Sequence, residues 1–125
     1  MSFDPVDGFS YVRLYAGEDG ESHFGDVTVA ATREDDVAVA APIPLGAMIM
    51  RAVLAPGTDA LPHNAPRRQF IVHLEGTVEV EASDGERRRF EPGDVVLVED
   101  TSGRGHVTRW VGDGERRVLF LALPD

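Results

Sequence analysis

Short apolar or alternating runs recur along the whole chain, and clusters of glycine, proline and aspartate separate them. No segment keeps the 3.6-residue period of an amphipathic helix over the dozen residues that such a helix needs. The breaks at 17–20, 83–86, 92–94 and 112–114 have turn composition. We therefore predict an all-β fold with an irregular connection at 33–45. The predicted strands are 11–16, 23–30, 47–54, 68–74, 77–82, 87–90, 95–99, 106–111 and 117–123.

The predicted strands fall into two kinds. Residues 77–82 alternate, which places Val78 and Val80 on a core face and the intervening glutamates in water. In residues 95–98 and 118–123, by contrast, the apolar side chains occupy both odd and even positions, so both faces of these strands should be covered. A small β-sandwich has few ways to cover both faces by itself. We therefore expect a homodimer.

Length, charge and composition limit the classes of protein to consider. A chain of 125 residues predicts one domain over 1–125. The net charge of -10 argues against a nucleic-acid partner, since such binding depends on clustered basic side chains. There is no cysteine and all twelve basic residues are arginine, which excludes thiolate and lysine-based chemistry. No run is apolar enough for a membrane span and no signal peptide is evident, so we expect a cytoplasmic protein without a membrane partner.

Two spacings are more specific than the strand pattern. The first is Gly57, five residues, His63, one residue, Ala65, three residues, Gln69, six residues and Gly76. It resembles the first motif of the cupin family, with Ala65 in place of its second histidine and Gln69 in place of its glutamate.

The second spacing runs from Pro92-Gly93-Asp94 to His106. It resembles the second cupin motif, although Glu99 replaces a proline and the loop before His106 is about two residues longer. The resemblance is strongest to small single-domain bacterial cupins of uncharacterised function. It implies a double-stranded β-helix, or jelly-roll barrel, with its core at 47–123 and additional strands at 11–30.

The resemblance also implies a metal site at the barrel mouth, altered in this chain. Residues two apart on a strand share a face, so Ala65 leaves a methyl group where a second imidazole would point into the barrel. Gln69 keeps the reach of glutamate but has no charge. Glu99 could complete a set of two histidines and one carboxylate, which suits non-haem iron. The predicted ligands of an iron, manganese, nickel or zinc ion are His63, Gln69, His106 and Glu99.

Further side chains are expected near such a site. His73 shares the strand face of Gln69, and Trp110 shares the face of His106. We predict that His73, Trp110 and Ala65 line the pocket. His23 lies in the N-terminal strands, and the sequence does not place it relative to the barrel mouth.

Three functions remain open at this point, and the sequence does not decide whether the chain is an enzyme. The first is a metal-bound cupin acting on a small organic molecule, such as an oxygenase or isomerase, with His63, His106 and Glu99 as catalytic residues. The alternative is a metal-free pocket for a small molecule, or a metal-free acid–base enzyme in which one of these histidines moves a proton. The third is an interaction protein with a vestigial barrel.

Overall fold

A computed structural model describes residues 5–55 and 61–125, which form ten strands and contain no helix. The all-β prediction is confirmed, and among these residues nothing resembles a membrane-spanning helix. Gly57 of the first motif lies outside the described residues. The strands are β1 (Pro5–Ala16), β2 (Ser22–Glu34), β3 (Val37–Ala40), β4 (Ala47–Val53), β5 (Gln69–Glu75), β6 (Thr77–Ala82), β7 (Arg87–Phe90), β8 (Val95–Glu99), β9 (His106–Val111) and β10 (Arg116–Ala122).

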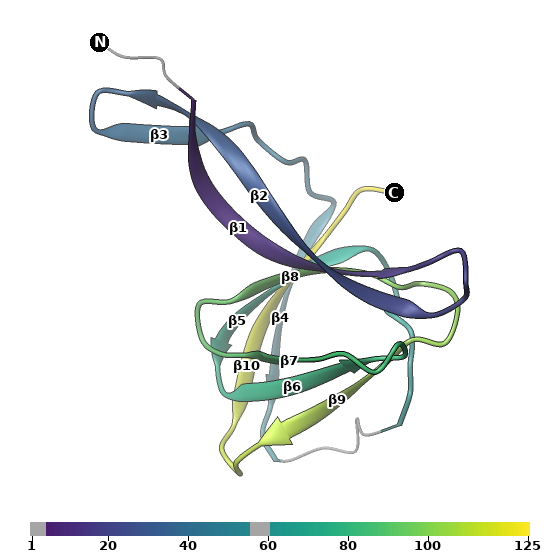
Figure 1. The fold of residues 1–125 in the computed structure, drawn as a ribbon. Coiled ribbons are helices and arrows are strands. Elements are labelled where there is room, and N and C mark those ends of the chain that lie inside the picture. Colours follow the sequence, from purple (N-terminus) through teal and green to yellow (C-terminus); the bar gives the residue numbers. More distant parts are fainter. Residues whose placement is uncertain (1–4, 56–60) are drawn as a thin grey trace.

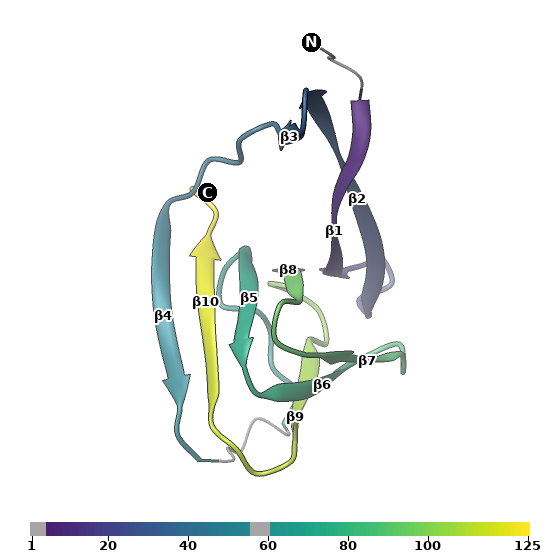
Figure 2. The same cartoon turned by 90° about the vertical axis from the view of Figure 1, so that its left-hand side faces the viewer.

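Two sheets face each other as the walls of a jelly-roll barrel (Figures 1 and 2). The larger sheet has the order β3-β2-β1-β8-β5-β10-β4, and the smaller has the order β7-β6-β9. The pairs are antiparallel except β1 with β8, which run parallel over Val12–Tyr15. Because strands adjacent in the sheet come from distant parts of the chain, the two predicted motifs are brought to one barrel.

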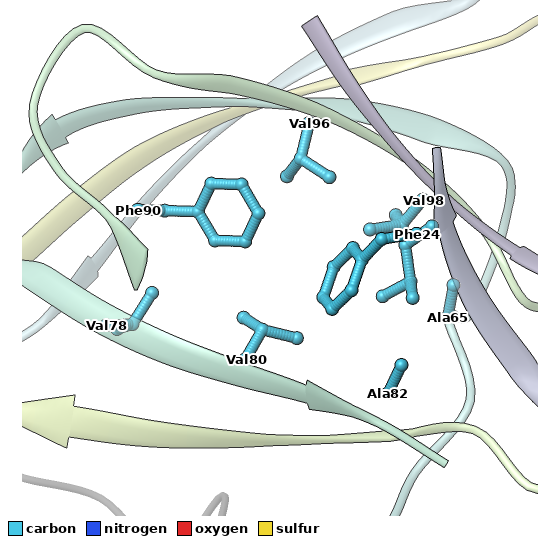
Figure 3. Close-up of a cluster of buried hydrophobic side chains, with 9 residues drawn as sticks. Phe24, Ala65, Val78, Val80, Ala82, Phe90, Val96 and Val98 are labelled. Carbon is cyan, nitrogen blue, oxygen red and sulfur yellow. The ribbon is translucent and has the colours of Figure 1, made fainter. Parts of the chain in front are cut away.

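The core fills the space between the two sheets (Figure 3). Val96 and Val98 of β8 contribute from the large sheet, and Val78 and Val80 of β6 contribute from the small sheet. This is the alternation predicted for 77–82, with every second side chain buried. The buried cluster consists of Leu14, Phe24, Ala65, Val78, Val80, Ala82, Phe90, Val96 and Val98.

The N-terminal third differs from the predicted strands. β1 begins at Pro5 and β2 runs to Glu34, so both strands are longer than expected. The predicted irregular stretch contains β3, which pairs with the end of β2. Asp35 makes the turn between them with a φ of 53°. Aspartate tolerates this left-handed conformation, so the acidic run that looked like a loop is a hairpin turn.

These extra segments form an arm that extends away from the barrel (Figure 1). We define the arm as residues 5–11 of β1, 27–34 of β2, and β3. β1 is hydrogen-bonded to the barrel strand β8 only from Val12 to Tyr15, so within the described residues the arm itself pairs with no barrel strand. Residues 41–46 lead from the arm back to β4, at the opposite edge of the large sheet.

Candidate functional site

His63 and His106 lie side by side at one end of the barrel. They form an isolated antiparallel bridge, in which each backbone N–H donates to the other residue's carbonyl at 2.9 Å. Their ring centroids are 4.5 Å apart at an interplanar angle of 60°. The structure thus joins the histidines of the two predicted motifs through both backbone and side chains.

A buried carboxylate orients one of these rings. Asp100, which is 0% exposed, accepts a hydrogen bond from Nδ1 of His106. An ionised carboxylate only accepts, so Nδ1 carries the proton and Nε2 of a neutral His106 is left with a lone pair. His63 is arranged in the same way, because its Nδ1 contacts the carbonyl oxygen of Leu61 at 3.1 Å. Both rings can therefore offer an Nε2 acceptor to a ligand.

The loop before His106 is held close to the other motif. The side-chain amide of Asn64 donates to the carbonyls of Asp100, Ser102 and Gly103 at 3.1–3.2 Å. Gly105 has a φ of +71°, and a Cβ there would lie 2.3 Å from the carbonyl oxygen of His63. Only glycine permits this close approach, so the longer loop packs directly against the backbone of His63 and fixes the position of His63 relative to His106.

Beside the histidines is a pocket of about 210 Å³. Two arginines, the exposed Arg51 of β4 and the buried Arg116 of β10, are among the residues that line it. The Arg51 guanidinium lies 5.7 Å from the ring centre of Phe120, which helps to orient it. None of the described lining residues is acidic. The lining consists of Arg51, His63, Ala65, Pro66, Ile71, Val98, His106, Thr108, Arg116 and Phe120.

A smaller chamber of about 30 Å³ lies deeper in the barrel and shares five lining residues with the pocket: Ile71, Val98, His106, Thr108 and Arg116. His73 forms part of its wall and stacks on Phe90, with ring centroids 5.4 Å apart and planes 6° apart. Burial, reinforced by the positive charge of Arg116, lowers the pKa of His73 from 6.5 to about 4. A neutral imidazole therefore lines the chamber near pH 7.

Two of the predicted metal ligands have other partners. The buried Gln69 lies on the inner face, but its Oε1 accepts a hydrogen bond from Arg67 at 2.8 Å. Glu99 lies on the opposite face of β8 from Val98, where Arg13 and Arg68 bind it at 2.5–2.9 Å. Burial alone would raise the pKa of Glu99, but these hydrogen bonds outweigh it and the pKa is lowered.

The described residues contain no group of three histidine, aspartate or glutamate side chains able to hold a metal ion. Glu99 therefore does not complete the set expected from the sequence. Asp100, the next residue along, is the carboxylate beside His106, and it binds Nδ1 rather than a site shared with His63.

The other predicted side chains have varied positions. Ala65 lines the pocket and also packs in the core (Figure 3). His73 lines the inner chamber, whereas Trp110 is not among the described residues of either cavity wall. His23 joins two hairpins instead, with ring nitrogens 3.0 Å from Asp19 and 2.9 Å from Asp84. Its pKa is raised, chiefly by the hydrogen bond to Asp19.

The barrel, with a pocket at one end between its two sheets, defines a small β-barrel protein of the jelly-roll class. A family model described as a cupin domain matches residues 50–122, more than half of the chain. The chain belongs to the cupin family, which confirms the resemblance and supports a small-molecule-binding fold. No curated protein matches the chain.

Three residues of this site were absent from the sequence-based candidates. Arg51 and Arg116 carried no distinguishing signal, because every basic residue of the chain is an arginine. To identify Asp100 from the sequence, one must know which face of β8 points into the barrel. β8 has apolar residues at both odd and even positions, so its sequence does not indicate the inner face. The register supplies this assignment, because Gln69 pairs with Val98 and both are buried.

Proposed function

We propose that the pocket binds a small organic carboxylate without a resident metal. The observation that carries this proposal is that two arginines and two histidines line one hollow, with no acidic residue among its described lining residues. The two arginines favour a negatively charged ligand, because arginine presents several N–H donors in a planar fork that matches a carboxylate. The two Nε2 atoms would accept hydrogen bonds from a hydroxyl or other donor of the same ligand.

The remainder of the wall indicates the kind of acid. Ile71, Phe120 and Pro66 offer apolar surface on which a short hydrocarbon or ring can pack. The volume of about 210 Å³ is below the roughly 300 Å³ at which drug-sized pockets begin. We therefore infer a compact acid with one carboxylate and one apolar portion. The His106–His63 pair would hydrogen-bond to a second polar group of the ligand.

A divalent metal fits these residues poorly. Two histidines leave the ion without the third protein ligand that catalytic metal sites normally have. Gln69 and Glu99 are bound to arginines, and the guanidinium groups of Arg51 and Arg116 would repel a cation in the pocket. The Asp100–His106 contact does resemble the support given to metal-bound histidines. That contact alone does not supply the missing ligand or offset the positive charge.

The same contact favours acid–base catalysis as a second candidate function. Asp100 fixes the His106 tautomer with an unprotonated Nε2 and would stabilise the ring after Nε2 accepts a proton. Such a residue could remove a proton from a bound acid and return it. Because this requires the ligand to be held first, the binding proposal is tested first.

The test of carboxylate binding is thermal unfolding in the presence of small organic acids and their neutral amides. An acid at about 100 times its dissociation constant should raise Tm by roughly 5–15 °C, and its amide should not. Arg51→Gln should abolish the shift, whereas Arg33→Gln, which removes an exposed arginine of the arm, should keep it. Equal shifts with acid and amide, or a full shift in Arg51→Gln, would contradict the proposal.

The absence of a resident metal is tested by elemental analysis of protein purified without a histidine tag or added metal. We expect less than about a tenth of an equivalent of iron, manganese, nickel or zinc, because only two protein ligands converge. His63→Ala and His106→Ala variants are the matched controls. Near one equivalent in the wild type, lost in both variants, would overturn the metal-free proposal and restore the metal-dependent one.

A further inference from the structure

The outer face of the large sheet carries two continuous rows of apolar side chains. The strand register aligns residues of β4, β10, β5 and β8 across the sheet, and paired residues share a face. Their outer position follows from Leu121 and Phe70, which line an external groove. The rows are Met48, Leu121, Phe70 and Leu97, and Met50, Leu119, Val72 and Val95.

The arm overhangs one end of these rows and creates the groove. Phe9 and Tyr11 of β1, with Ile43 and Leu45 of the following connection, lie across from the sheet around a hollow of about 330 Å³. Tyr11 packs edge-on against Phe70 at 5.2 Å, which covers the base of the groove. None of the groove-lining residues is charged.

Much of this apolar surface is exposed. Phe9, Ile43, Leu45, Met48 and Met50 are 59%, 50%, 46%, 57% and 76% exposed. With total areas on the order of 200 Å² for each large side chain, they present about 600 Å² together, before the half-buried residues of the rows are added. That equals the largest apolar patches of typical monomers, and approaches the roughly 800 Å² per partner of a stable protein interface.

We propose that this face binds the same face of a second copy of the chain. A two-fold interface must be self-complementary, and this face has both parts: protruding side chains such as Met50, and a groove under the arm. A polar rim also borders it, because Glu99 on the outer side of β8 is bound by Arg13 and Arg68. The net charge of -10 opposes an anionic membrane or nucleic acid as the occupant.

The proposal explains the two strands whose apolar residues occur at both parities. In both strands the inner residues fill the barrel and the outer residues lie in the two rows. The outer Leu97 of β8 is already buried by the chain itself, so the partner would cover the half-buried outer residues Val95, Leu119 and Leu121. The homodimer expected from the sequence therefore acquires a specific surface, in which the groove-side residues of the arm take part.

The test is the molecular mass in solution of the wild type and of two charge variants with matched exposure. Met50→Glu places a charge within the rows. Val39→Glu is the control, because Val39 is 65% exposed but lies on the side of β3 opposite to the groove-lining Ala40. Sedimentation velocity between about 1 and 100 µM should show a wild-type dimer of twice 13.6 kDa. Met50→Glu should raise the dimer dissociation constant at least tenfold, and Val39→Glu should leave it within about twofold.

Each outcome decides the proposal. A wild type that stays monomeric at 100 µM overturns it and leaves the face to a different partner. A dimer that survives in Met50→Glu, or that Val39→Glu dissociates equally, assigns the interface elsewhere and also overturns it. Circular dichroism of both variants checks that their folds are intact, and an equivalent variant, Met48→Glu, replaces Met50→Glu if that variant fails to fold.

Discussion

The two faces of the large sheet reverse the usual distribution of polarity. Inside the barrel the sheet presents Gln69, His73 and Arg116, all buried, next to the hydrophobic cluster. Outside it presents exposed methionines, such as Met48 and Met50, and the apolar rows around them. Buried polar groups cost free energy unless they are paired, and exposed apolar patches are uncommon on monomers. This contrast is what the proposed ligand on the inner face and the proposed second copy on the outer face would account for.

Asp100 and Glu99, which are adjacent in the sequence, show the same contrast between the inner and the outer face. Asp100 is fully buried beside His106, whereas the side chain of Glu99 on the outer face is 12% exposed between two arginines. Both are carboxylates, and their neighbours differ. If the two faces differ in this way, substitutions on the inner face should change stability more than substitutions on the outer face.

The largest effect is expected for Asp100→Ala. Removing this carboxylate leaves the Nδ1–H of His106 buried without a partner, so the free energy of unfolding should fall by about 3–5 kcal/mol. Denaturant unfolding at pH 7 provides the measurement, with Asp100→Asn as the variant that keeps the volume. A loss below about 1 kcal/mol would show that the inner face tolerates unpaired polar groups and would weaken the comparison.

The next effect is a pH dependence due to His73. Its pKa is about 4 in the folded chain and 6.5 ordinarily, so the unfolded chain binds a proton that the folded chain does not as pH falls. Stability should therefore be unaffected above pH 6.5 and should decrease from pH 6.5 to 4 by up to about 3 kcal/mol. His73→Phe keeps a ring against Phe90 and should lose this part of the pH dependence. An unchanged slope in that variant would assign acid sensitivity to other groups.

The smallest effect is expected for Glu99→Gln on the outer face. Its ion pairs with Arg13 and Arg68 are partly screened by water, because both arginine side chains are more than 40% exposed. The free energy of unfolding should change by about 1 kcal/mol or less, and less still at high salt. Chemical denaturation at low and high salt measures this. A loss as large as that of Asp100→Ala would mean that the two faces do not differ as described.

The sequence predicted much of the barrel but less of the site. Turn residues and alternation located most strands, because both depend on local chemistry. The motif spacing indicated His63 and His106, which the structure brings together. Whether Glu99 points into the barrel or away from it depends on which face of β8 is the inner one, and the apolar sequence of β8 does not indicate this.

The arm was missed for a different reason. β3 reads Val-Ala-Val-Ala, a weak strand pattern beside prolines, and its pairing with the end of β2 across the Asp35 turn makes it a strand. Long-range pairing therefore decided the site, whereas the arm depended on a local hairpin turn whose acidic residues looked like a loop.

The bridge between residues 63 and 106 also affects the order in which the parts of the barrel fold. Hairpins such as β6–β7 pair residues that are close in the sequence. The bridge instead joins residues 63 and 106, so it closes a long loop of chain whose strands belong to both sheets. We therefore expect the pocket to form late in folding, after the hairpins. A ligand that recognises the finished pocket would then slow unfolding and leave the folding rate almost unchanged. The lifetime of the folded barrel would in that way depend on the ligand concentration around it.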